Sequence, residues 1–264
     1  MASATPAACY VYAVVPGGGG QQDLGCIGLD GARVYTVGGA GGPESVAAVV
    51  HACGAMPYAS GDPGQVERWA TAHDAVVAAA LNLFDSVVPV GFDTIVHRPG
   101  QDAEEVARGW LREKMPSLTV QLARLRGRRE YGVQLYWEPQ GAELGAADTE
   151  AIREAQAEIV GKPPGLAYMY RQRVDLAVRR ARAARADALV AELEHTVRAV
   201  AEAVRTERLK PPAAGWEMLA NLSGLMPAAR EPLLLAALAP FADMPAVGVR
   251  VTGPWPPYSF VEGV

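Results

Sequence analysis

The amino-acid sequence predicts an α+β protein of two domains. Short runs rich in β-branched and aromatic residues indicate strands, and longer runs with apolar residues at helical spacing lie between them. A third observation is a segment that contains Pro139, Gly141 and Gly145, residue types that interrupt regular structure. We therefore expect an N-terminal domain at residues 1–140 and a C-terminal domain at 141–264.

The N-terminal domain is expected to begin with a strand at residues 9–15, a run of aromatic and β-branched residues. A hairpin should follow, with strands at 26–29 and 33–37. The turn between them is predicted at Asp30-Gly31, because an Asp-Gly pair between apolar runs is a strong hairpin signal. The glycine-rich runs on either side of this hairpin are expected to be loops.

The middle of this domain is predicted to be mainly helical. A short apolar run at 46–53 and a longer run at 103–125 are expected to be helices. Residues 64–82 should form another, which Asp62 caps and Pro63 begins, since these residue types are favoured at those positions. Three extended segments complete the domain: 87–90, 94–96 and 129–137. This order suits an antiparallel sheet with helices on one face, and a ferredoxin-like sandwich is the simplest such arrangement.

The C-terminal domain is expected to contain a helical hairpin. A long helix is predicted at 165–209, ended by Pro211 and Pro212, after a short helix at 149–160. Apolar residues of the long helix recur at alternating steps of three and four, which is the spacing of a coiled-coil seam. The remaining elements expected are a strand at 216–225, a helix at 228–239 and a strand at 247–251. The domain is therefore predicted to be a helical hairpin joined to a small α+β unit.

Composition narrows the function classes. The chain is half hydrophobic and has a formal net charge of −5, which argues against a dedicated nucleic-acid binder. Its three cysteines, Cys9, Cys26 and Cys53, are too few and too widely spaced for a disulfide framework or a zinc site, so we expect reduced thiols. No secretory signal and no apolar run of membrane-spanning length is seen. We therefore expect a soluble, cytoplasmic protein.

Motifs that carry catalytic chemistry are not found. The histidines lack metal-ligand spacing, and the sequence contains no HExxH, CxxC or Gly-x-Ser-x-Gly pattern. The first glycine-rich run follows a strand as a phosphate loop would, but no Gly-Lys-Ser/Thr comes after it. We expect no catalytic residues, no cofactor and no metal.

An arginine-rich stretch of the long helix is one candidate for partner binding. Its four candidate residues are Arg179, Arg180, Arg182 and Arg185. A solvated helix face is one interpretation, and a basic docking surface for an acidic protein partner is another. RNA binding is a weaker third interpretation, because no aromatic residues lie between these arginines.

The C-terminal tail is the second candidate. Its notable residues are Gly253, Pro254, Trp255, Pro256, Pro257, Tyr258 and Phe260. The prolines lack a backbone donor and fix φ, so the segment should be extended, while each aromatic ring brings a large apolar area. The rings are expected either to cover the core of the C-terminal domain or to form an exposed aromatic docking site.

This tail resembles the C-terminal signature of the gas vesicle GvpF/GvpL family. Residues 253–261 read Gly-Pro-Trp-Pro-Pro-Tyr-Ser-Phe-Val. Other regions resemble the family in the same order, from its opening strand through its hairpin to its His-led helix and the strand that follows: 10–15, 28–31, 73–77 and 88–92. Two positions depart from the pattern, because Gly91 stands where a larger, often basic residue is expected and Asp93 where glycine is expected.

The resemblance implies a ferredoxin-like N-terminal domain, and a C-terminal domain with a coiled-coil hairpin and a second ferredoxin-like element. It also implies an accessory protein needed to form gas vesicles, the hollow protein shells that give cells buoyancy. The implied partners are the small hydrophobic shell protein and other accessory proteins, not nucleic acid or a membrane. No catalytic residues are implied, and the expected location is cytoplasmic and gas vesicle associated.

A different class of function remains open on the residues alone. A ferredoxin-like small-ligand-binding protein or enzyme would use a pocket between helix and sheet. It predicts an apolar cavity with convergent polar groups and a histidine or cysteine of perturbed pKa. The absence of paired catalytic residue types in the sequence counts against this alternative.

Overall fold

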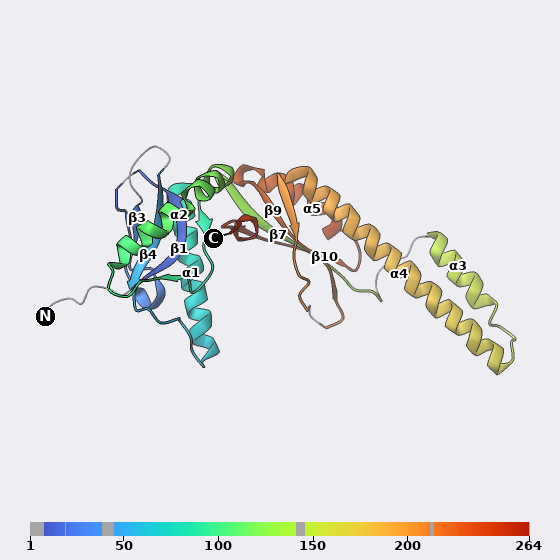
Figure 1. Cartoon of the computed structure of the whole chain (residues 1–264). Helices are drawn as coiled ribbons and strands as arrows, with labels where there is room; N and C mark the ends of the chain where they lie inside the picture. Colours follow the sequence, from blue (N-terminus) through green and yellow to red (C-terminus); the bar gives the residue numbers. More distant parts are fainter. Residues whose placement is uncertain (1–7, 19, 39–44, 141–145, 212–213, 264) are drawn as a thin grey trace. The chain divides into compact units, whose positions relative to one another are not determined.

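The computed structural model describes residues 8–18, 20–38, 45–140, 146–211 and 214–263. It is a mixed α/β structure with two sheets (Figure 1). Contacts divide the chain into two compact units. The first comprises Met1–Glu130 and Pro254–Val264, and the second comprises Tyr131–Gly253.

The first unit is built around an antiparallel sheet whose central strand is β1. Its strands are β1 Ala8–Pro16, β2 Asp23–Gly25, β3 Val34–Gly38, β4 Val46–Cys53, β5 Val88–Pro89 and β6 Ile95–Val96. They follow the order β2-β3-β4-β1-β5, and β6 also pairs with β1. The β1–β4 pairing runs from Ala8 opposite Cys53 to Pro16 opposite Val46, with an irregularity between Val11 and Ala13. Because β1 has partners on both edges, it forms the middle of the sheet.

Helices α1 (Pro63–Phe84) and α2 (Ala103–Leu125) cover opposite faces of this sheet. Alternate residues of a strand point to opposite faces, and Tyr12 of β1 lies in one core with Val76 of α1. Tyr35 of β3 lines a pocket together with Glu104 of α2, so it points to the face that α2 covers. The expectation of helices on one face is wrong for this unit, and the full burial of β1 from Ala8 to Val15 follows from cover on both sides.

The segment at 46–53 is a strand, not the short helix predicted from its apolar run. It is β4, which lies between β1 and β3, and residues 46–51 are all buried. A continuously apolar run of this length fits a fully buried strand as well as a helix. The valines of this run favour the strand. The residues predicted to open that helix, at 43–44, lie outside the described residues, as do 39–42 of the second glycine-rich loop.

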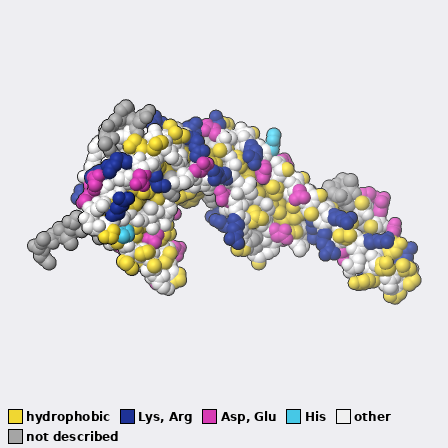
Figure 2. Space-filling model, in the orientation of Figure 1, with side chains coloured by type: hydrophobic (Ala, Val, Ile, Leu, Met, Phe, Trp, Pro, Cys, Tyr) yellow, Lys and Arg dark blue, Asp and Glu magenta, His cyan; other side chains and the backbone are white. Residues whose placement is uncertain are grey.

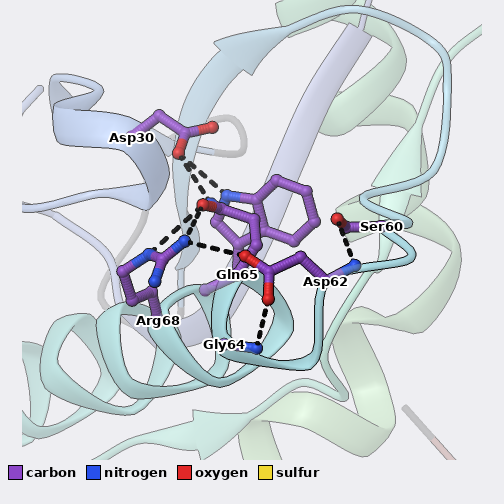
Figure 3. A network of polar contacts seen from close by, with 7 residues as sticks. Asp30, Ser60, Asp62, Gly64, Gln65 and Arg68 are labelled. Atoms are coloured by element: carbon purple, nitrogen blue, oxygen red, sulfur yellow. Dashed lines mark hydrogen bonds and ion pairs between the residues drawn. The ribbon is translucent and has the colours of Figure 1, made fainter.

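Local sequence signals place α1 where it was predicted. The Asp62 carboxylate accepts a hydrogen bond from the Gly64 N–H at 3.0 Å, and Pro63 is the first helical residue. Arg68 lies one turn further along and reaches the same carboxylate at 3.4 Å (Figure 3). Gln65 extends from this first turn towards Asp30, with 3.4 Å between its Nε2 and the Asp30 Oδ1. The start of α1 is thus tied to the loop before β3.

The predicted Asp-Gly turn is present, but its first strand lies earlier than expected. Asp30 and Gly31 have φ values of 52° and 75° and belong to a 3-10 turn, η1 (Leu29–Gly31). The strand that pairs with β3 is β2 at Asp23–Gly25, where Asp23 lies opposite Tyr35. Residues 26–28 are therefore part of the connection.

The second unit contains a four-stranded sheet in the order β10-β7-β9-β8. Its strands are β7 Arg128–Trp137, β8 Ala203–Thr206, β9 Glu217–Pro227 and β10 Val247–Trp255. Its helices are α3 Ala146–Ala157, α4 Pro164–Val200, the 3-10 turn η2 Ala228–Arg230 and α5 Glu231–Ala242. In the core, alternate residues of β7 pack against one stripe of α4 and against the buried side of α5. These residues are Tyr131, Val133, Leu135 and Trp137 of β7, Leu189, Leu193 and Val197 of α4, and Leu234, Leu238 and Phe241 of α5. The strands and helix predicted at 129–137, 216–225, 228–239 and 247–251 are present.

The long helix ends at Val200, earlier than the predicted end at residue 209. Ala201 adopts an extended conformation, and β8 then pairs with β9 from Ala203 opposite Leu225 to Thr206 opposite Leu222. The prolines therefore do not end the helix; strand pairing does.

The helical hairpin of α3 and α4 is present, but its apolar seam is shorter than predicted. Val174 and Ala181 on α4 are buried, whereas Ala184 and Ala188, further along the same predicted seam, are exposed. The 12 residues of α3 span only about 18 Å, so α3 covers just the first part of α4. Within the described residues, no helix combines the length and apolarity needed to cross a membrane.

Candidate functional site

The C-terminal tail packs on the first unit, and not on the core of the second as one interpretation expected. Phe260 is 2% exposed, and Tyr258 packs against the core that β1 and α1 share. Ser259 donates two hydrogen bonds to the buried Glu130 carboxylate, from its N–H at 2.9 Å and its hydroxyl at 2.7 Å. The Tyr258 hydroxyl donates to the Asp74 Oδ1 at 2.8 Å.

Helix α2 holds the end of the tail. Gln121 and Glu262 form a reciprocal pair, in which the Gln121 amide donates to the Glu262 carbonyl at 3.0 Å and accepts from its N–H at 2.9 Å. Lys114 donates to the Gly263 carbonyl at 2.9 Å, and Arg124 donates to the Phe260 carbonyl. The tail is therefore fixed by burial and by hydrogen bonds between its backbone and side chains of α2, which lie far from it in the sequence.

A groove of about 580 Å³ lies between this tail and α1. Its lining residues are Thr71, Asp74, Ala75, Ala78, Glu130, Trp255, Pro256 and Tyr258. The four α1 residues are spaced by three, one and three, so they share one helix face. Because most of these side chains are small, they leave room beside the rings of the tail.

The groove combines apolar walls with two carboxylates. Trp255 is 51% exposed, whereas Glu130 is 8% exposed and engaged by Ser259. Burial, and then the hydrogen bond to Asp74, raise the pKa of Tyr258, so its phenol stays a neutral donor. Among the described residues that line the groove there is no histidine or cysteine. The groove therefore offers apolar contact surface together with two acidic groups.

The four arginines predicted as a docking surface do not share one exposed face. Arg179 and Arg180 are exposed, whereas Arg182 and Arg185 are half-buried. The Nη2 of Arg185 lies 3.9 Å from the Met244 Sδ, and the buried Nε of Arg182 has no hydrogen-bond partner among the described residues. Figure 2 shows basic and acidic side chains interspersed over α4. The arginines thus divide between solvent and the body of the second unit.

A network of histidines and tyrosines lies inside the first unit, where sequence reasoning did not place one. The Tyr12 hydroxyl lies 2.7 Å from the Nδ1 of His51, whose Nε2 lies 2.9 Å from the Tyr58 hydroxyl. The Tyr10 hydroxyl lies 2.9 Å from the Nδ1 of His73, and the His73 Nε2 donates to the Val90 carbonyl at 3.1 Å. Both ring nitrogens of each histidine are therefore engaged. The partners are up to 63 residues apart, so spacing along the chain gave no signal for them.

Burial sets the charge state of this network. It lowers the pKa of His51 to about 4 and also lowers the pKa of His73, so both rings are neutral near pH 7. Neither histidine lines the groove. Within the part of the chain that the structure describes, no group of three or more His, Cys, Asp or Glu side chains forms a metal site. Both histidines are thus part of a buried hydrogen-bond network.

Comparisons with known sequences agree with the resemblance seen in the motifs. The family model described as "Gas vesicle synthesis protein GvpL/GvpF" matches residues 8–262. Gas vesicle protein L2 of Halobacterium salinarum is 30% identical over 228 residues, which cover 84% of this chain and 80% of that protein. Gas vesicle protein L of Haloferax mediterranei is 29% identical over 249 residues, which cover 90% of this chain and 73% of that protein.

Solved structures show the same fold. The crystal structure of the gas vesicle protein GvpF from Anabaena sp. matches with a TM-score of 0.70 and 17% identity, covering 98% of this chain and 99% of that one. GvpF from Microcystis aeruginosa matches with a TM-score of 0.62 and 17% identity, covering 96% and 98%.

Proposed function

Because the chain belongs to the gas vesicle synthesis protein GvpL/GvpF family, we propose that it is an accessory protein of gas vesicle assembly. It binds the small hydrophobic shell protein and other accessory proteins while vesicles nucleate or grow. The observation that carries this proposal is the family match, which extends over residues 8–262. The proposed location is the cytoplasm, in association with gas vesicles.

A physical need supports this role. A small subunit with a large apolar surface aggregates in water unless a partner covers that surface until assembly. The groove beside Trp255 offers an apolar contact surface for such a partner. We propose binding without catalysis.

We further infer a ferredoxin-like topology for the second unit. Its elements follow the order β7, α4, β8, β9, α5, β10, with the α3–α4 hairpin inserted after the first strand. This βαββαβ succession, with the sheet order β10-β7-β9-β8, supports the inference. In the first unit four strands precede α1, so the inference does not extend to that unit. The α3–α4 hairpin would serve as a coiled-coil-like arm, and the predicted boundary near residue 140 stays a proposal.

Two measurements test the proposed function. The full chain, immobilised through an added N-terminal tag, should capture the shell protein from a co-expressing lysate, and an unrelated tagged protein of similar charge should not. A deletion strain should lack gas vesicles and regain them when the gene is restored. Absence of capture, together with normal vesicles in the deletion strain, would contradict the proposal.

A further inference from the structure

We infer that the groove between α1 and the tail receives a lysine or arginine side chain that a partner polypeptide presents from an apolar surface. The inference rests on the proposed function, because it names the chemistry of a partner at that site. It is carried by the juxtaposition of apolar walls, an exposed indole and two carboxylates in one groove of the first unit.

The apolar walls fit the aliphatic part of such a side chain. Ala75 and Ala78 form the helix side of the groove, and Pro256 lies on the tail side. Lysine and arginine bury their methylene stems against apolar surface while the charged end stays among polar groups. Trp255 is 51% exposed, so its ring can contact the cation, and tryptophan is the best aromatic partner for one.

The carboxylates supply the charge complement. The Tyr258 hydroxyl engages Oδ1 of Asp74, and Asp74 is exposed, so its carboxylate is open to a further partner. Glu130 is 8% exposed, and its hydrogen bonds come from Ser259, which is neutral. Within the described part of the chain neither carboxylate forms an ion pair, and no basic side chain lines the groove. A cation from a partner would therefore meet two acidic groups that have no cationic partner among the described residues of this chain.

The same charges disfavour other occupants. Two carboxylates repel a phosphate backbone, so a nucleic acid is a poor fit. A wholly apolar segment would contact the walls but would leave the Asp74 charge without a counterion at a partly desolvated interface. A basic residue with apolar neighbours would contact the apolar walls and also place a positive charge beside the carboxylates.

A pair of helical peptides tests this chemistry directly. The two peptides have the same apolar face, and the residue at its centre is lysine in one and norleucine in the other. Norleucine keeps most of the stem and removes the charge. We expect the lysine peptide to bind the full chain at least about tenfold more tightly by fluorescence anisotropy, as a desolvated cation–π contact and a charged hydrogen bond imply. Equal binding of the two peptides, or tighter binding of the norleucine peptide, would overturn the inference.

Variants of the chain assign the effect to the groove. Asp74→Asn removes the charge but keeps an acceptor for Tyr258, and Trp255→Ala removes the exposed ring. Each should abolish most of the preference for lysine, while Glu67→Gln, which removes an exposed carboxylate of α1 outside the groove, should leave it unchanged. Circular dichroism melts show that each variant is folded before binding is measured. An unchanged preference in both folded groove variants would overturn the assignment.

The capture assay separates this inference from the proposed function. If the wild-type chain captures the shell protein and both groove variants capture it equally well, the groove assignment fails and the proposed function stands. If the wild-type chain shows the lysine preference but captures no shell protein, and vesicles form normally without it, the proposed function fails and the groove chemistry stands.

Discussion

Burial decides the chemistry of His51. Its imidazole is 1% exposed and lies between the hydroxyls of Tyr12 and Tyr58. Desolvation disfavours the charged ring, which is why its pKa falls from an ordinary 6.5 to about 4. The histidine therefore favours the folded state only while it is neutral.

The first prediction is that the first unit loses stability in acid because of His51. Since the unfolded chain binds the proton near pH 6.5 and the folded chain only near pH 4, the free energy of unfolding should fall as pH decreases between these values. The shift corresponds to about 3 kcal/mol at most. Urea unfolding at several pH values measures it.

The control for this prediction is His51→Gln, which removes the titrating ring and retains an amide that can hydrogen bond. This variant should be less stable near pH 7 and should show a shallower loss of stability between pH 6.5 and 4. The same slope in the variant and in the wild type would contradict a role for His51.

The three cysteines should differ sharply in reactivity. Cys9 is fully buried, and burial raises its pKa to about 12, whereas Cys26 is exposed. Because the thiolate is the reactive form, a second prediction is that Ellman's reagent labels Cys26 first and reaches Cys9 only in denaturant. Cys26→Ser should remove the fast phase. Equally rapid labelling of Cys9 in the native chain would contradict this burial.

Single positions also show where sequence reasoning reaches its limit. Glycine was expected at position 93 from the family pattern, and Asp93 has a φ of 65°, a conformation that glycine adopts freely. The aspartate is held there because its carboxylate accepts from the Tyr58 N–H at 2.9 Å and its own N–H donates to the Tyr10 hydroxyl at 2.9 Å. The sequence could identify the unusual residue, but its stabilising partners are 35 and 83 residues away.

At the scale of elements, close approach at Gly28 fixes the connection between β2 and β3. A Cβ at this position would lie 2.7 Å from the Tyr12 hydroxyl oxygen and 2.9 Å from the Ala32 carbonyl oxygen. The Ala32 carbonyl also accepts from the Gly28 N–H at 2.9 Å, so the backbone cannot move away without losing that bond. Only glycine fits this space without a shift of the strands.

The third prediction follows from this contact. Gly28→Ala should lower the free energy of unfolding by about 1–3 kcal/mol, as expected for overpacking against a fixed backbone. Gly54→Ala is the matched control, because nothing lies within 4 Å of a Cβ there. Urea unfolding of both variants measures the difference. Equal stability of the two would show that the strands adjust freely around position 28.

Elements with strong local signals were predicted well. Helix α1 begins at Pro63 after its Asp62 cap, and α2 spans the predicted residues 103–125. The errors occur where pairing between distant strands decides the outcome. Residues 46–53 form β4 because they pair with β1 on one edge and with β3 on the other. Helix α4 ends early because the next residues form β8, which pairs with β9. The local periodicity of these segments does not show which distant strands they pair with.

At the scale of the whole molecule, the tail closes the first unit from the far end of the chain. The sequence identified its aromatic and proline residues as important, but the groove they form depends on α1, some 180 residues earlier. The spacing of Thr71, Asp74 and Ala78 on α1 was visible, yet nothing local indicated which segment would face it. The groove thus includes the tail residues Trp255, Pro256 and Tyr258 that the sequence singled out, its wall on α1 was not anticipated, and partner binding by the tail stays a prediction.

The fourth prediction separates the two roles of the tail. Phe260 is 2% exposed, so Phe260→Ala should leave a cavity and lower the free energy of unfolding by about 3–5 kcal/mol. Trp255→Ala in the same tail should change stability by less than about 1 kcal/mol, since half of that side chain is already exposed. Thermal melts give the stability difference. Amide exchange should show that Phe260→Ala loosens α2, because the side chains of Arg124 and Gln121 hydrogen bond to the backbone of the tail.

Because Trp255→Ala should impair lysine-peptide binding and Phe260→Ala should impair folding, the pair assigns recognition and anchoring to different residues. Equal melting temperatures for the two variants would contradict that division.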